Sequence, residues 1–220
     1  MLPFYGRKLP RRIKKTEVEK LQKTNFFFSK RNISKLAIKI SEKPSEVNLE
    51  IGFGDGKNII SQAQVLKDEL FIACDPYLKG SLFIRKNIER LKIKNLALTD
   101  LPFLELTKYL KNLYFKKIFI LFPDPWPKKK HKKRRLINDN FIKIISKFTK
   151  KKSRILVSTD NRDYLNQILY TFYKTKEFKL NNKYFNDSLI MKYNIPKTTY
   201  LRKAMESGKK SYFLVFDKEI

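Results

Sequence analysis

The chain has 220 residues, enough for one α/β domain with a sizeable core or two small ones, and we expect one. Hydrophobic residues make up 42% of it and aromatic residues 14%, which excludes a disordered basic tail and predicts a packed globule. The formal net charge of +29 predicts a polyanionic partner, either nucleic acid or an anionic membrane surface.

Cysteine content and hydropathy narrow the classes of protein and the cellular location that the sequence allows. Cys74 is the single cysteine, which excludes an internal disulfide framework and a cysteine-rich zinc site. No apolar run reaches the roughly 18 residues that a membrane span needs, and the first residues lack the apolar core of a secretory signal. We therefore expect a cytoplasmic protein with no membrane partner and no metal, and nucleic acid remains the expected polyanion.

The first 40 residues predict a basic arm, partly disordered, ahead of a domain that spans 41–220. Its aromatic triplet, Phe26 to Phe28, is expected to pack, while its first dozen residues are expected to be disordered without a ligand. Its basic side chains should add charge to binding; they are Arg7, Lys8, Arg11, Arg12, Lys14 and Lys15.

From position 47 onward, apolar runs of strand length alternate with amphipathic stretches. Strands are predicted at 47–51, 70–74, 96–98, 117–122 and 154–158. Helices are predicted at 59–66, 82–91, 104–113, 136–148 and 164–172. This alternation predicts a parallel sheet with helices on both faces. In such a sheet ligands bind beyond the carboxyl ends of the strands, so the residues after each strand are the candidates for chemistry.

The first strand leads into a glycine-rich turn, Glu50-Ile51-Gly52-Phe53-Gly54-Asp55-Gly56. Alternate glycines let the backbone turn sharply and approach a ligand closely. The turn lacks the third glycine of the dinucleotide fingerprint, because Lys57 stands there. It resembles motif I of S-adenosylmethionine-dependent methyltransferases. A glycine turn without a ligand remains the alternative.

Two further carboxylates follow strands. Asp75 ends the second strand and could accept hydrogen bonds from both ribose hydroxyls of an adenosine. It could equally cap the segment that follows it. Asp100 follows the third strand, where methyltransferases of this kind often place an Asp near the adenine.

The fourth strand delivers one carboxylate, Asp124, to a loop that holds three prolines and the sole tryptophan, Trp126. Seven of the next eight residues are Lys or Arg, and the eighth is His131, the sole histidine. The carboxylate could bond a base or a cofactor amine while the basic residues neutralise phosphates. A solvated, nonspecific basic face is the alternative for the run alone.

The sequence Phe-Pro-Asp-Pro-Trp followed by a Lys/Arg/His cluster closely resembles the signature of bacterial tRNA guanine-N7 methyltransferases. The resemblance spans about residues 47–216. It implies a Rossmann-like methyltransferase fold, with a mostly parallel seven-stranded sheet, helices on both faces and an antiparallel last strand near 211–217. It also implies S-adenosyl-L-methionine as methyl donor, guanosine 46 of the tRNA variable loop as target, and a monomer or homodimer.

The resemblance carries over residue by residue. It makes Asp124 catalytic. The residues implied for the cofactor are Glu50, Gly52, Gly54, Gly56, Asp75, Asp100 and Asp124, and those for the substrate are Lys128, His131, Arg134, Asp160, Thr198 and position 201. Leu201 departs from the pattern, because the family's Thr-x-Tyr/Phe-Glu motif has Glu there and Leu cannot accept hydrogen bonds from a guanine edge. Glu206 is the nearby candidate to compensate.

The chemistry asks little of the protein beyond placement. Guanine N7 carries a lone pair and no hydrogen, so no base must remove a proton before methyl transfer. We therefore interpret Asp124 as an orienting and electrostatic residue. Two other hypotheses stay open: a catalytically silent RNA-binding protein on a methyltransferase fold, and a methyltransferase acting on another RNA or on DNA.

Overall fold

The structure is a computed structural model that describes residues 13–42, 44–181, 183 and 186–219. The chain divides into two units, Met1–Lys111 and Asn112–Ile220, and each is described by itself. The arm residues Arg7, Lys8, Arg11 and Arg12 lie outside the described part of the chain.

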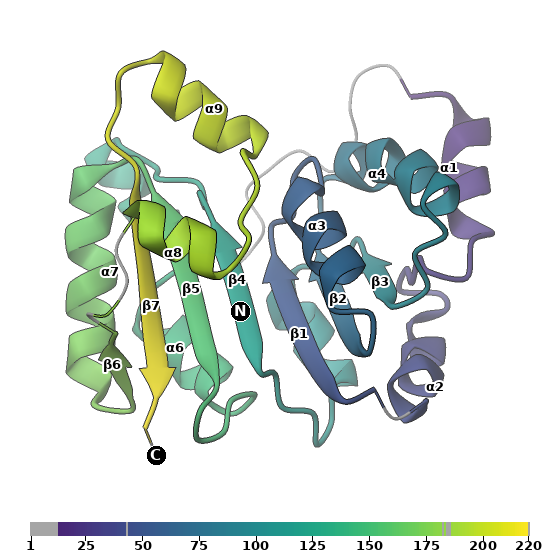
Figure 1. Cartoon of the computed structure of the whole chain (residues 1–220), viewed down its shortest axis with the longest axis horizontal. Coiled ribbons are helices and arrows are strands. Elements are labelled where there is room, and N and C mark those ends of the chain that lie inside the picture. Colours follow the sequence, from purple (N-terminus) through teal and green to yellow (C-terminus); the bar gives the residue numbers. More distant parts are fainter. Residues whose placement is uncertain (1–12, 43, 182, 184–185, 220) are drawn as a thin grey trace. The chain divides into compact units, whose positions relative to one another are not determined.

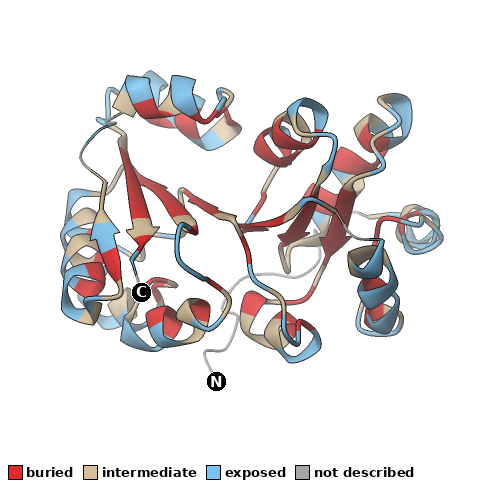
Figure 2. Cartoon of the chain, turned by 60° about the horizontal axis from the view of Figure 1, so that its bottom comes forward, coloured by how far each residue is buried: buried red, intermediate tan, exposed pale blue. Residues whose placement is uncertain are grey.

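The first unit is built on three parallel strands in the order β3-β2-β1. They are β1 (Glu46–Ile51), β2 (Glu69–Cys74) and β3 (Leu96–Thr99). The register pairs Ile51 with Cys74 and Cys74 with Thr99, so the three carboxyl ends lie level at one edge. Nearly every strand residue is buried (Figure 2), which is typical of a parallel sheet covered on both faces.

The helices of the first unit are α1 (Lys15–Gln22), α2 (Leu36–Ser41), α3 (Lys57–Val65), α4 (Leu78–Arg90) and the short α5 (Phe103–Leu106). An ion-pair network joins α1 to α4, as the two helices lie side by side in Figure 1. Arg85 on α4 bonds Glu17 on α1 and Glu89 on its own helix, each at 3.1 Å. Because Arg85 is largely buried, these carboxylates compensate a charge that would otherwise be costly to desolvate.

The aromatic triplet belongs to the core of the first unit. Phe26, Phe27 and Phe28 are each at most 5% exposed. Phe27 forms a parallel bridge with Leu98, and the flanking backbone bonds are 2.7 and 2.8 Å long. This segment therefore covers the outer edge of β3, which would otherwise present unpaired backbone groups.

The second unit holds four strands in the order β4-β5-β7-β6. They are β4 (Lys117–Leu121), β5 (Arg154–Thr159), β6 (Phe178–Leu180) and β7 (Tyr212–Lys218). β4 and β5 are parallel, whereas β7 runs antiparallel to both β5 and β6. The predicted fold class, a mostly parallel seven-stranded α/β sheet whose last strand is antiparallel, is confirmed for the described residues.

The helical segments of the second unit are the 3-10 helix η3 (Lys129–Arg134), α6 (Asp139–Ser146), α7 (Arg162–Thr175), α8 (Asn186–Lys192) and α9 (Thr199–Glu206). In Figure 1, α6 and α8 lie on opposite faces of the strands of this unit. α7 packs through Phe172, whose ring stacks on Phe216 of β7 with centroids 3.7 Å apart. Its first turn is capped by Asn161, whose side chain accepts from Tyr164 N–H at 2.8 Å.

Several predicted elements differ from those observed. The helix expected at 104–113 is wrong: one turn of α5 passes into a 3-10 turn, Thr107–Tyr109, and the left-handed φ of 56° at Asn112 prevents continuation. Helices α1, α2, α8 and α9 and strand β6 were not predicted from the sequence. No helix among the described residues is long and apolar enough to cross a membrane.

Candidate functional site

The glycine turn after β1 needs glycine for both conformation and space. Gly52, Gly54 and Gly56 all have positive φ, between 55° and 78°, where side chains are strained. At Gly56, which precedes α3, an added Cβ would lie 2.2 Å from Ile84 Cδ1. The end of the turn at Gly56 is therefore packed directly against α4.

Gly80 on α4 completes this packing and was not among the residues predicted from the sequence. A Cβ at position 80 would lie 2.1 Å from the carbonyl oxygen of Gly54. The first turn of α4 thus rests directly on the glycine turn. An isolated glycine inside a helical pattern is the signal that could have revealed it, because such a residue costs helix stability and usually has a packing reason.

Asp75 closes the turn from the end of β2. Its Oδ2 accepts from Gly54 N–H at 3.0 Å, and its Oδ1 accepts from Tyr77 N–H at 2.9 Å. The second bond is the capping role that the sequence left open, and the first ties the carboxylate to the glycine turn. Each carboxylate oxygen can accept more than one hydrogen bond, so a carboxylate at this position is suited to accept from a ligand diol.

Glu50 is buried near the end of β1, with 2% of its surface exposed. Desolvation raises its pKa to about 8, with smaller increases from Asp55 and Asp75, while a 3.2 Å bond from Asn58 Nδ2 acts in the opposite direction. Asp100 follows β3 at the same edge and is half-buried. The first unit therefore gathers three carboxyl groups around a glycine turn, which suits a ligand with hydroxyl donors and positive charge.

In the second unit, β4 leads into a loop with strained backbone. Phe122 and Trp126 have φ of 51° and 39°, unusual for bulky side chains, and such conformations cost about 1–3 kcal/mol each. Phe122 N–H donates to the backbone oxygen of Ser158 at 3.0 Å and to its Oγ at 3.1 Å. The Phe122 ring also meets Phe213 edge to face, 5.8 Å between centroids. β5 and β7 thus hold the start of the loop.

Asp124 occupies the middle of this loop, between Pro123 and Pro125. Its side chain is exposed, yet partial desolvation by the surrounding protein raises its pKa above the ordinary value. Water stabilises the negative charge of a partly desolvated carboxylate less well than that of a fully solvated one. It is therefore suited to face a positively charged group.

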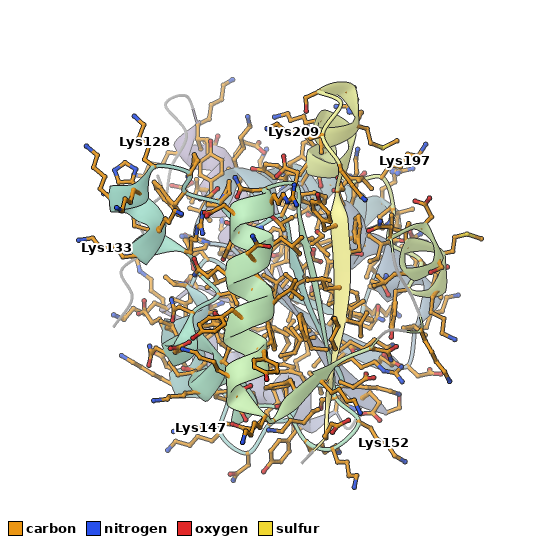
Figure 3. All side chains as sticks on the ribbon, turned by 90° about the vertical axis from the view of Figure 1, so that its left-hand side faces the viewer. Lys128, Lys133, Lys147, Lys152, Lys197 and Lys209 are labelled. Carbon is orange, nitrogen blue, oxygen red and sulfur yellow. The ribbon has the colours of Figure 1, made fainter. Side chains whose placement is uncertain are left out.

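The basic run forms η3, and its side chains do different things. Figure 3 shows Lys128 and Lys133 extending outward from this segment, where phosphates could reach them. Lys132 Nζ instead pairs with Asp163 at 2.7 Å. Arg135, at the end of the run, is 1% exposed. The expectation that the whole run neutralises phosphates is therefore wrong for Arg135. Its side chain points inward, where neutral and acidic groups accept its hydrogen bonds.

His131 and Arg134 both contact Trp126. The His131 ring meets the indole edge to face at 5.7 Å, and the Arg134 guanidinium lies 4.9 Å from the indole centroid. Partial desolvation, followed by the positive charges of Arg134, Lys130 and Lys128, lowers the pKa of His131 below its ordinary value of 6.5. The imidazole is therefore neutral near pH 7 and can donate or accept a hydrogen bond.

The remaining predicted substrate residues lie near α9. Asp160, directly after β5, is half-buried, and Lys209 Nζ lies 3.7 Å from its Oδ2. Thr198 caps α9: its Oγ1 accepts from Leu201 N–H at 3.2 Å. Leu201 is 5% exposed and faces the core of the unit.

Comparison with known proteins places the chain in a family. A family model described as "Putative methyltransferase" matches residues 44–214. A tRNA (guanine-N(7)-)-methyltransferase of Wolbachia pipientis wMel is 34% identical over 202 residues, which cover 92% of this chain and 86% of the relative. The chain belongs to the tRNA (guanine-N(7)-)-methyltransferase family. A relative of the same name from Zymomonas mobilis is 31% identical and is covered to 74%.

Solved structures of other methyltransferases superpose on this chain. A 16S rRNA methyltransferase superposes with a TM-score of 0.57 at 14% identity, covering 82% of this chain and 93% of that one. An antibiotic-related methyltransferase gives the same TM-score at 19% identity, covering 86% and 94%. At these identities the likeness shows the methyltransferase fold alone.

The family's Thr-x-Tyr/Phe-Glu motif has the form of a capping box, in which the Glu at the third helical position bonds the N-cap N–H. Here that N–H, on Thr198, donates to Pro196 O at 2.8 Å instead. Leu201 is thus accommodated without an unsatisfied donor. Glu206 does not replace it: five residues on, it lies about 140° around the helix and pairs with Arg202 at 3.7 Å.

Proposed function

We propose that this protein transfers a methyl group from S-adenosylmethionine to N7 of a guanine in tRNA, forming 7-methylguanosine. The target is guanosine 46 of the variable loop. Family membership, shown by the match over 92% of the chain to a tRNA (guanine-N(7)-)-methyltransferase, carries this proposal. The tRNA substrate accounts for the net charge of +29.

The first unit fits the methyl donor. A Cβ at Gly52 would have no heavy atom within 4 Å, so the turn is open at this position and a ligand can approach the backbone there. Asp75 can accept hydrogen bonds from the ribose hydroxyls, and Asp100 offers a carboxylate to the positive charges of the donor. Glu50 is protonated below its pKa of about 8 and offers a neutral carboxyl group for hydrogen bonding. When bound, S-adenosylmethionine supplies an electrophilic methyl group and leaves as S-adenosylhomocysteine.

The second unit fits the base and the RNA. Guanine N7 attacks the methyl carbon with its lone pair while the carbon–sulfur bond breaks, and no proton moves in this step. The methylated base becomes cationic, and Asp124 stabilises that developing charge and orients the ring. Lys128, His131 and Arg134 bind the RNA, the lysine through phosphate and the neutral His131 through a hydrogen bond.

Asp160 and Thr198 complete the substrate contacts in this proposal. Lys209 holds Asp160 in place, so its carboxylate can accept from the guanine edge. Because Thr198 Oγ1 is engaged as the α9 cap, its contribution to the base contact is secondary. Residues 1–40 are proposed to add positive charge to tRNA binding, next to a domain spanning 41–220, although their aromatic triplet packs in the core of the first unit.

The test is methyl transfer from labelled S-adenosylmethionine to an unmodified tRNA transcript, with the product nucleoside identified by digestion and mass spectrometry. We expect 7-methylguanosine, and none in a matched transcript that lacks the variable-loop guanosine. Binding of tRNA without S-adenosylmethionine binding would instead support a silent RNA-binding scaffold. A different methylated nucleoside would assign the protein to another nucleic-acid substrate.

A charge-removing variant tests the role of Asp124. We expect Asp124→Asn to lower turnover by about 10²–10³-fold and to leave the affinity for S-adenosylmethionine nearly unchanged. Asp139→Asn is the matched control, because Asp139 is an exposed carboxylate on α6 that pairs with Lys174 at 2.7 Å. Full turnover by Asp124→Asn would remove Asp124 from this role.

A further inference from the structure

The loop that carries Asp124 has few ways to hold itself in place. Pro123, Pro125 and Pro127 have no N–H, so only Asp124 and Trp126 retain backbone donors between positions 123 and 127. Such a loop has few backbone donors of its own, so most of its carbonyl groups need donors from elsewhere. The position of the carboxylate therefore depends on contacts made by other segments.

Arg135 supplies the donor on the far side of Asp124. Its Nε donates to the Pro125 carbonyl oxygen at 2.8 Å. Its Nη1 donates to Gln167 Oε1 at 2.8 Å and its Nη2 to Asp163 Oδ2 at 2.5 Å. The guanidinium also lies 4.8 Å from the centroid of the Tyr164 ring. Three residues within one stretch of α7 thus fix the group that holds the loop.

The two ends of the loop are therefore anchored to different elements. Ser158 on β5 accepts from Phe122 N–H on one side of Asp124, and Arg135 donates to Pro125 on the other. Pro125 is directly bonded to Asp124, so a shift of its carbonyl moves the carboxylate as well. The fixed planar fork of Arg is required, because Lys is a point donor and cannot hold the same three acceptors.

The same geometry excludes a direct role for Arg135 in binding phosphate. Its side chain is 1% exposed, and three hydrogen-bond acceptors and an aromatic face occupy the guanidinium. A phosphate would have to displace Asp163 and open the packing against α7. The neighbouring Lys133, in contrast, is exposed.

We propose that Arg135 is a positioning residue, which fixes Asp124 in its catalytic geometry by tying the Pro125 carbonyl to α7. This inference rests on the proposed methyl transfer, and it assigns to one member of the basic run a task other than RNA binding. Misplacement of a catalytic group by about 1 Å can cost about 10²-fold in rate. Loss of the Arg135 guanidinium fork should therefore lower turnover, because Asp124 would be misplaced.

The decisive variant is Arg135→Lys, which keeps the charge and removes the fork. We expect turnover to fall by about 10²-fold at saturating tRNA and S-adenosylmethionine, while the slope of tRNA affinity against salt concentration stays that of the wild type. Lys133→Ala is the comparison for phosphate binding, and its slope should fall by about 1. A reduced salt slope with normal turnover in Arg135→Lys would overturn the proposal.

One control variant and one fluorescence measurement separate positioning from a general loss of stability. Phe172→Leu removes part of the stacked Phe172–Phe216 pair, far along α7 from Asp163, and should lower stability without changing turnover per folded molecule. Trp126, the sole tryptophan, reports on the loop without any substrate. Its emission and its quenching by acrylamide should change in Arg135→Lys and remain unchanged in Phe172→Leu.

The outcomes distinguish this inference from the proposed function. If the wild type makes no 7-methylguanosine, the proposed function fails, whereas the Trp126 measurement still decides whether Arg135 holds the loop. If the wild type is active and Arg135→Lys keeps both full turnover and an unchanged Trp126 signal, the proposed function stands and the positioning role is refuted.

Discussion

Gly80→Ala is the change that most directly tests how the glycine turn, the proposed cofactor site, is held. Alanine would ordinarily favour the helix by up to about 1 kcal/mol relative to glycine. Here its Cβ would lie 2.1 Å from Gly54 O, and real Cβ contacts essentially never fall below 3.0 Å, so the two segments must separate by at least 0.9 Å. Gly54 N–H bonds Asp75 at 3.0 Å. A shift of that size along the bond would break it, because such bonds rarely exceed about 3.2 Å.

The loss can be expressed as an affinity. A hydrogen bond to a charged group contributes about 1.5–3 kcal/mol, which corresponds to about 10–100-fold weaker binding of S-adenosylmethionine. Calorimetric titration with S-adenosylhomocysteine measures this, and Lys79→Ala, an exposed neighbour on α4, is the matched control. Unchanged affinity in Gly80→Ala together with a raised melting temperature would refute the reasoning, because only the helix-propensity gain would then remain.

Three further changes probe titratable and capping groups. His131 has a lowered pKa, so the emission of Trp126 in contact with it should change on acidification with a midpoint below pH 6.5, and His131→Asn should abolish that transition. The pKa of Glu50 is raised from 4.5 to about 8. Its contribution to stability is therefore full below pH 4.5 and is lost as pH rises through 8. Glu50→Gln should flatten that part of the profile of unfolding free energy against pH. Thr198→Ala should lower the free energy of unfolding by about 1 kcal/mol through loss of the α9 cap, and denaturant titration should find Thr198→Ser near the wild type.

The strands and the strand-end carboxylates could be predicted because they obey short-range rules. A buried parallel strand is a continuous apolar run, and its carboxyl end is where ligand residues gather. The positions of Glu50, Asp75 and Asp100 follow from these rules, and the structure brings all three to one edge of the first unit. The helix wrongly expected at 104–113 shows the limit, because the apolar spacing there also suits a short turn whose buried Leu106 and Leu110 face the core.

The packing of α4 on the glycine turn could not be read from motif spacing. Gly80 lies 24 residues beyond Gly56, and nothing local states that a helix turn will rest on the Gly54 carbonyl. Leu201 is a similar case. Its side chain is compatible with a lost base contact or with a core position, and only its 5% exposure on α9 shows that it packs.

The basic run after Asp124 shows why charge alone does not define a binding surface. A guanidinium inside the protein must have acceptors, since an uncompensated buried charge is costly. Arg135 finds them in a carbonyl of the proline-rich loop and in side chains presented by α7. Arg135 thus supplies a donor to a loop that has few, and the loop carbonyl supplies one of the acceptors that the buried guanidinium needs. Because Lys132 shares Asp163 with Arg135, a part of this run serves the loop's geometry, and only the exposed lysines are candidates for the proposed contacts to RNA.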